Sequence, residues 1–328
     1  MSIRSALITP ALLALFVSAC AGAPDADTKQ AAATPDFPVE ATSCGFTSTI
    51  DTKVERGITM NQGATEVVLA LGAEDQLVGT SYLDDEVPAK WKRAYDSVPV
   101  LSKEYADHET VLAARPDFVY GSYSGSLESK TAGTPEELTK LGIGAYVSPF
   151  GCGENKPSVG VSFDSVWDEI DTVAAAFGVP DRAAAIRAEQ KASLKTLADE
   201  KAGEGLDVFW FDSGDKMAFA GAGEGGPQLI LDAIGATNVF ADVDGGWADV
   251  SWERVVKTDP DVIVMPEAVW STVADKIALL KKDPALRDLR AVREERFVVL
   301  PFSETTPGVR LADGARAVAD GLDALDLG

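Results

Sequence analysis

The chain has 328 residues, which is enough for two domains of ordinary size, and its 46% hydrophobic and 8% aromatic content excludes a chain disordered throughout. Its formal net charge of −23 argues against nucleic acid or an anionic membrane surface as an electrostatic partner. The same charge favours a neutral or cationic ligand.

Residues 1–19 have the pattern of a signal peptide. Arg4 precedes an apolar run at 6–17 that is too short to span a bilayer. The run ends in Val17-Ser18-Ala19-Cys20, which resembles a lipobox and predicts lipid on Cys20; an ordinary secretory signal that happens to contain a cysteine is the alternative. Residues 20–43 are rich in Ala, Thr, Asp and Pro and are predicted to be a flexible tether. We therefore expect an exported protein that lipid holds at the outer face of a membrane.

The next segment, 44–160, alternates short apolar runs with amphipathic stretches, and this pattern predicts an α/β lobe with a parallel sheet. The predicted strands are 58–60, 77–80, 118–120 and 145–147, and the predicted helices are 64–71, 110–114 and 135–141.

Connecting helices are predicted over 161–205. The first runs from 163 to 177 and is closed by Gly178. The second, 181–202, contains neither Pro nor Gly, follows Pro180 and ends at Gly203. At 1.5 Å per residue it is roughly 33 Å long, which suits a strut between two lobes.

The alternation returns over 206–328. Predicted strands are 208–211, 262–265 and 297–300, and predicted helices are 227–234, 252–257, 275–280 and 308–325. Two motifs recur in the same order in both halves. Residues 63–72 match 226–235, and residues 109–120 match 253–264. Both copies of the second motif begin with Glu and reach a Pro-Asp pair seven residues later. The predicted fold is thus two Rossmann-like α/β lobes with parallel sheets joined by one long α-helix.

The three cysteines fit an exported lipoprotein. With Cys20 carrying lipid, Cys44 and Cys152 remain in an oxidising compartment, where a disulfide between them is predicted. Two separate thiols, an intermolecular bond or a role in ligand attachment are the alternatives.

Catalytic and metal-binding patterns are scarce. The single histidine, His108, excludes sites built from clustered imidazoles and the usual base of a hydrolytic triad. Residues 221–226 match G-x-G-x-x-G, but they are better explained as a loop leading into the helix that starts at Pro227. We therefore predict no enzyme activity, no metal site and no resident cofactor.

Aromatic and polar residues gather after predicted strand ends, where open α/β sheets bind their ligands. Such rings suit a large, partly planar ligand. In the first lobe these residues are Gln62, Tyr82, Tyr105, Ser122 and Tyr123; in the second they are Ser213, Asp215, Lys216, Trp247, Trp270, Phe302 and Glu304.

The motifs GATEVVLALG, GTSYLDD, ETVLAARPDFV and GGWADVSWERVVKTDPDVIV, together with the 181–202 helix, resemble the solute-binding components of ABC importers for iron-siderophores, haem and vitamin B12. The resemblance covers residue 57 to the C-terminus and implies two α/β lobes joined by a rigid helix. It implies partnership with a permease and an ATPase, with no nucleic acid involved.

The resemblance also implies roles for single residues. Glu109 and Glu253 fall on the two positions that dock on the permease. Tyr82 matches a position that often contacts ligand, Trp247 corresponds to a stacking tryptophan of the vitamin B12-binding member, and Tyr105 and Tyr123 lie near two further contact positions. Arg310 is the main arginine candidate for a carboxylate-type chelate.

The leading hypothesis is a lipid-anchored receptor for an iron-siderophore or a related chelate such as a corrinoid or haem. A receptor for a deazaflavin-type cofactor precursor is the alternative. An extracytoplasmic enzyme is disfavoured because no histidine base or G-x-S-x-G motif is available, and an adhesion scaffold is the third class considered.

Overall fold

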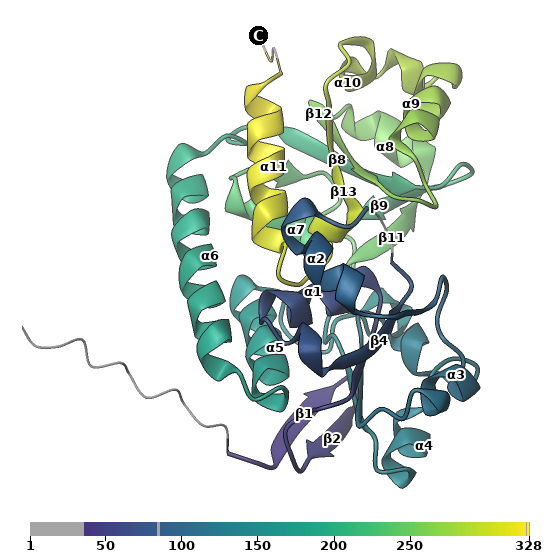
Figure 1. Ribbon diagram of the computed structural model, residues 1–328. Helices are drawn as coiled ribbons and strands as arrows, with labels where there is room; N and C mark the ends of the chain where they lie inside the picture. The colour runs from purple at the N-terminus through teal and green to yellow at the C-terminus, as the bar shows by residue number, and fades with distance from the viewer. Residues whose placement is uncertain (1–35, 84–85, 326, 328) are drawn as a thin grey trace, which may run out of the picture. The chain divides into compact units, whose positions relative to one another are not determined.

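The computed structural model describes residues 36–83, 86–325 and 327 (Figure 1). The predicted signal peptide, Cys20 and residues 20–35 of the predicted tether lie outside the described residues.

The N-terminal lobe is built on a parallel sheet with the strand order β5-β4-β3-β6-β7. Its strands are β3 (Gly57–Met60), β4 (Leu77–Ser81), β5 (Val100–Ser102), β6 (Phe118–Gly121) and β7 (Gly144–Val147). All residues of β3 and β6 are buried, as expected for strands with both faces covered. Because the strands are parallel, their carboxyl ends share one edge of the sheet.

Helices connect these strands, and polar side chains cap the start of two of them. The helices are α1 (Gln62–Ala70), α2 (Lys92–Ser97), α3 (His108–Ala113) and α4 (Pro135–Lys140). Asp107 caps α3 by accepting from the Thr110 amide, and Thr134 and Glu137 form a capping box on α4.

A hairpin precedes the sheet and corrects the predicted tether. β1 (Val39–Ser43) pairs antiparallel with β2 (Phe46–Ile50) and packs on β7. The tether was predicted to reach residue 43, but Ala41 and Ser43 are buried against the lobe and the segment is a strand. Cys44, at the hairpin turn, is joined to Cys152 by a disulfide that closes a sequence separation of 108 residues.

The C-terminal lobe has a mixed sheet of order β11-β9-β8-β12-β13, with β10 paired to β8. Its strands are β8 (Asp207–Ser213), β9 (Ala218–Gly221), β10 (Thr237–Asn238), β11 (Trp247–Val250), β12 (Val262–Glu267) and β13 (Phe297–Pro301). β10, β8, β12 and β13 are parallel, whereas β9 and β11 run antiparallel to their neighbours. The predicted parallel sheet is confirmed in β10, β8, β12 and β13. The antiparallel β9 and β11 extend it and were not predicted; a short loop with Gly214 at φ 99° turns β8 directly back into β9.

The helices of this lobe match the predicted ones, with α10 in addition. They are α7 (Gly226–Ala233), α8 (Trp252–Thr258), α9 (Val273–Lys282), α10 (Arg290–Arg293) and α11 (Leu311–Asp323). The glycine-rich segment 221–226 connects β9 to α7, as predicted from the sequence.

Two helices connect the lobes: α5 (Phe163–Ala176) and α6 (Pro180–Glu200), the latter at the left of Figure 1. The predicted strut, 181–202, is shifted by one or two residues, because Pro180 fits the first turn and Lys201 adopts a left-handed conformation that ends the helix. Its buried residues, Ala183, Gln190 and Leu197, follow each other at intervals of seven, so one narrow side of the helix packs against the rest of the protein.

Gln190 on this side of the helix contacts both sides of the connection. Its Oε1 accepts from the Trp167 indole of α5 at 2.8 Å, and its Nε2 donates to the carbonyl of Val309 at 2.7 Å. The side chain thus ties α5 to the segment that leads into α11.

The core of the N-terminal lobe contains a buried carboxyl. The Tyr120 hydroxyl donates to Glu169 Oε1 at 2.6 Å, and the Ser148 hydroxyl donates to Oε2 at 3.0 Å. Burial raises the pKa of Glu169 to about 7, although both hydroxyls act in the opposite direction.

This raised pKa predicts a pH-dependent difference in stability between the native chain and Glu169→Gln. Between pH 4.5 and 7 the unfolded chain loses a proton that the folded chain keeps, so the native chain should lose about 3 kcal/mol of unfolding free energy relative to the variant as pH rises. Urea denaturation across this pH range measures the difference. Unfolding free energies that change equally with pH in the two proteins would contradict the raised pKa of Glu169.

Candidate functional site

A cavity of about 310 Å³ lies between the two lobes. Glu86, Val87, Pro88 and Ala89 line it from the N-terminal lobe, and Glu267, Pro301 and Arg310 line it from the C-terminal lobe. Glu267 and Pro301 end the parallel strands β12 and β13, which is where open α/β sheets bind ligands. Its volume is at the lower end of the range for small-molecule sites.

Arg310 is the centre of a buried polar cluster that crosses between the lobes. Its guanidinium lies 3.4 Å from the Glu66 carboxylate of α1 and also pairs with Glu304 and donates to the Ser303 hydroxyl. Arg310 is 6% exposed and Glu66 is 1% exposed. The predicted ligand-binding residues Glu304 and Arg310 therefore bind each other in this structure.

Gln62, another predicted ligand-binding residue, extends the same cluster. It is fully buried, and its amide donates to Glu66 Oε1 at 2.9 Å and to the Glu86 carbonyl at 3.3 Å. Gln62 thus holds the segment that carries Glu86 at the cavity wall. Its position favours a supporting role over direct contact with a ligand.

Tyr123 and Trp247 come from opposite lobes and line the same small space, together with Phe150 and Thr306. The space measures about 10 Å³, which is close to the minimum for one water molecule. The structure therefore brings together the two aromatic residues predicted from the sequence, in an arrangement too narrow to hold a ligand ring between them.

The remaining predicted aromatic residues form one edge-to-face pair in each lobe. Tyr82 and Tyr105 have ring centroids 4.9 Å apart, and the Tyr105 hydroxyl donates to Asn61 at 2.9 Å. Trp270 and Phe302 have centroids 5.2 Å apart, with Trp270 46% exposed and Phe302 largely covered. Such pairs present apolar ring edges, which suits a ligand with hydrophobic surfaces.

Asp215 lies apart from the cavity of about 310 Å³. It lines a second hollow of about 330 Å³ with Trp270 and Lys276, and its backbone carbonyl accepts from the Trp252 indole. Trp270 is thus shared between the aromatic pair and this hollow.

Sequence reasoning missed three acidic residues: Glu66, which pairs with Arg310; Asp212, which is buried beside Lys276 and Trp247; and Glu267, which lines the cavity. Asp212 ends the apolar run of β8 and is buried, and burial raises its pKa to about 6 while Lys276 and the Trp247 indole act in the opposite direction. The signal for Glu66 and Asp212 was a carboxylate inside an otherwise apolar run, where burial without a partner is costly.

The two residues predicted to dock on a permease occupy equivalent positions. Glu109 is the second residue of α3, after the cap Asp107, and Glu253 is the second residue of α8, after the cap Ser251. Both are exposed. The backbone amide of Glu253 and the Ser251 hydroxyl hold the pKa of that carboxyl below its ordinary value, so it is charged at neutral pH.

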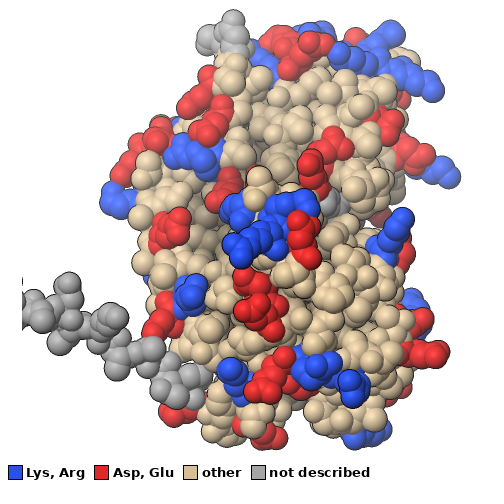
Figure 2. All heavy atoms as spheres, viewed as in Figure 1, with Lys and Arg blue, Asp and Glu red and all other residues tan. Residues whose placement is uncertain are grey.

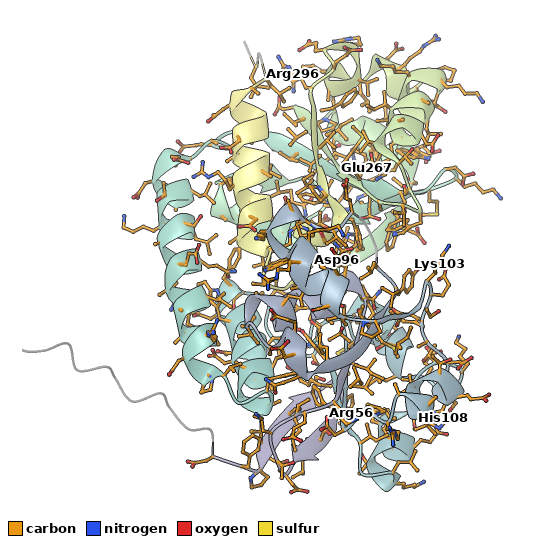
Figure 3. The ribbon with its side chains drawn as sticks, viewed as in Figure 1. Arg56, Asp96, Lys103, His108, Glu267 and Arg296 are labelled. Atoms are coloured by element: carbon orange, nitrogen blue, oxygen red, sulfur yellow. A yellow bond between two sulfur atoms is a disulfide. The ribbon has the colours of Figure 1, made fainter. Side chains whose placement is uncertain are left out.

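Figure 2 shows how charged side chains are distributed on one face of the molecule. The face shown in Figure 2 carries acidic and basic side chains intermixed with wide neutral areas. Among the residues that the structure describes, no group of three His, Cys, Asp or Glu is arranged to hold a metal ion, and no described helix is long and apolar enough to cross a membrane. His108 lies on α3 (Figure 3), where its Nδ1 is 2.6 Å from the Ala132 carbonyl.

A family model described as periplasmic binding protein matches residues 58–304, which is more than half of the chain. The chain belongs to the periplasmic binding protein family. YvrC, an uncharacterized ABC transporter substrate-binding lipoprotein of Bacillus subtilis strain 168, is 26% identical over 319 residues, covering 95% of this periplasmic binding protein and 94% of YvrC.

A vitamin B12-binding protein of Yersinia pseudotuberculosis is 26% identical over 211 residues, with 64% of this chain and 69% of that protein covered. The crystal structure of an ABC-type Fe3+-hydroxamate transport system from Saccharomonospora viridis matches with a TM-score of 0.76 at 26% identity, covering 88% of this chain and 100% of that one. The family predicted from the motifs and the two-lobe α/β fold are both confirmed.

The buried cluster predicts a large effect of removing its cation. Arg310→Met removes the guanidinium that pairs with Glu66 and Glu304, which should lower the unfolding free energy by about 3–5 kcal/mol. Urea denaturation measures the loss, and adding Glu66→Gln to Arg310→Met should recover part of it. The exposed Arg287→Met is the control, with an expected change under about 0.5 kcal/mol. Equal midpoints for Arg310→Met and Arg287→Met would show that the cluster contributes nothing.

Proposed function

We propose that this protein is a lipid-anchored extracytoplasmic receptor of an ABC importer, which captures a large chelate of the iron-siderophore or corrinoid kind and delivers it to the permease. The observation that carries the proposal is the cavity between two α/β lobes, lined from both, in a chain of the periplasmic binding protein family. Its relatives are named as a substrate-binding lipoprotein, a vitamin B12-binding protein and an Fe3+-hydroxamate transport system.

The proposed anchor is lipid on Cys20, followed by a tether up to the hairpin that begins at Val39. The lipobox at 17–20 supports this assignment, as does the lipoprotein name of YvrC. A lipid-held receptor stays close to its permease, which raises its effective concentration there.

Ligand capture is assigned to the interface between the lobes. The cavity walls supply Glu86, Glu267 and Arg310, and the edge-to-face pairs Tyr82–Tyr105 and Trp270–Phe302 supply aromatic surface in each lobe. A ligand that reaches Trp247 and Tyr123 needs these two residues to move apart, because the space between them is about 10 Å³. We therefore expect the lobes to separate slightly when the ligand enters.

Permease docking is assigned to Glu109 and Glu253. Each is exposed at the same position of a capped helix, one helix in each lobe. Carboxylates in this arrangement suit recognition by arginines, which bind carboxylates with two parallel hydrogen bonds. The connecting helix α6 keeps the two lobes, and hence the two carboxylates, in a defined relation.

The double variant Glu109→Ala/Glu253→Ala separates binding from transport. Ligand affinity, measured by quenching of tryptophan fluorescence with ferrioxamine B and cyanocobalamin, should stay within about twofold of the native value, since neither carboxylate lines the cavity. Uptake of the same ligands by cells that contain the cognate permease should fall at least about tenfold, because the charged contacts are lost.

Glu136→Ala is the matched control. Glu136 is also the exposed second residue of a capped helix, so its removal causes a loss of helix-terminus stabilisation comparable to that of either docking substitution taken singly. Uptake with this control should remain at the native level. Full uptake with the double variant would contradict the docking assignment, and no binding of either ligand by the native protein would contradict the proposed function.

A further inference from the structure

The cavity between the lobes has one positively charged residue in its described wall, Arg310, and that residue is already paired. Its guanidinium contacts two carboxylates, Glu66 and Glu304, and all three side chains are at least 86% buried, with exposures of 6%, 1% and 14%. A guanidinium held by two carboxylates leaves an excess of negative charge at this point of the wall.

Two further carboxylates line the same cavity. Glu86 comes from the N-terminal lobe, and Glu267, labelled in Figure 3, comes from the end of β12. Glu267 Oε2 accepts from the Val273 amide at 3.0 Å, which fixes this carboxylate at the start of α9. The described wall and the cluster behind it therefore hold four carboxylates, Glu66, Glu86, Glu267 and Glu304, against one guanidinium.

Nearby lysines do not reverse this balance. Lys276 is buried, donates to the Pro266 carbonyl and is attracted to Asp212 and Glu267. Lys90 follows the lining residue Ala89 in the chain, but its ammonium pairs with Asp313 at 2.8 Å. Both lysines are engaged by carboxylates of the protein itself.

We propose that this cavity selects ligands that are neutral or positively charged and rejects chelates with negative groups on their rim. The proposal rests on the proposed function of the same site and narrows it. An added negative group on the ligand meets repulsion from Glu267 and Glu86, which acts at short range and is screened by salt because both side chains are exposed. The one cation of the described wall, Arg310, is already held by Glu66 and Glu304 and does not offset this repulsion. Hydroxamate-type iron chelates and corrinoids with intact amide side chains fit this requirement. Tris-catecholate and citrate-type chelates do not, and the propionates of haem are unfavourable for the same reason.

The test compares ligands that share a core and differ in charge. Ferrioxamine B carries a free ammonium, its N-acetyl derivative is neutral at that position, and its N-succinyl derivative carries a carboxylate there. Cyanocobalamin and a cobalamin in which one amide is hydrolysed to a carboxylate form the second series. Isothermal titration of the ligand-free protein at low salt gives the affinities. Whichever core binds, the carboxylate derivative should bind about tenfold or more weakly than its neutral counterpart, with a smaller ratio at high salt.

Substitution of one wall carboxylate tests the origin of the preference. Glu267→Gln keeps an oxygen that can accept from the Val273 amide and removes the charge, so it should reduce the discrimination against the carboxylate derivative at least about threefold while the variant still binds the neutral ligand. Glu40→Gln, at an exposed position of the hairpin strand β1, is the control and should leave the discrimination unchanged.

The outcomes separate the two claims. Binding of either core with equal or tighter affinity for the carboxylate derivative would overturn the inference and leave the proposed function standing. Discrimination that Glu267→Gln does not change would also overturn it, because the charge of the cavity would then not be the cause. If the protein binds neither core, the proposed function fails and the inference fails with it.

Discussion

The contact between Arg310 and the carboxylates of Glu66 and Glu304 joins the two halves of the molecule. Glu66 belongs to α1 of the first lobe, and Arg310 directly precedes α11 of the second, so a buried ion-pair cluster crosses between lobes whose sheets are otherwise separate. Such a cluster is costly to break, because each buried carboxylate would lose the guanidinium that it binds. The position of the cavity wall therefore depends on it, since Arg310 lines the cavity and Gln62 connects Glu66 to the Glu86 backbone.

The connecting helix α6 also holds the two lobes together. Gln190 bonds both the Trp167 indole and the Val309 carbonyl, one residue before Arg310, so the helix and the ion-pair cluster hold the same segment. A receptor built in this way is expected to make small adjustments between its lobes when a ligand enters. Recognition of the loaded receptor by a permease then depends mainly on the stability of the bound complex, and a fixed relation between Glu109 and Glu253 is useful for that purpose.

Local patterns in the sequence were sufficient to predict most of the helices and parallel strands, because Pro-Asp breaks, glycine stops and apolar runs act within a few residues. The short elements α2, α10, β5 and β10 were missed. Local patterns also sufficed for Glu109 and Glu253, whose positions in the two repeated motifs put each at the start of a helix. The Glu66–Arg310 pair could not be predicted, because its members are 244 residues apart and the apolar run around Glu66 indicates a buried carboxylate without indicating its partner. The hairpin at 39–50 and the antiparallel β9 and β11 were missed for a related reason: burial of Ala41 and pairing of β11 arise from contacts with distant segments.

The central claim is that this protein carries a small-molecule ligand in the cavity between its lobes. Native mass spectrometry combined with an absorbance spectrum of the protein purified from its own host tests this most directly. The account predicts a mass increment of one chelate or corrinoid per chain, with visible absorption that leaves the protein on denaturation. If the protein is purified from its host without any bound small molecule, and binds neither ferrioxamine B nor cyanocobalamin on dialysis, the claim is contradicted.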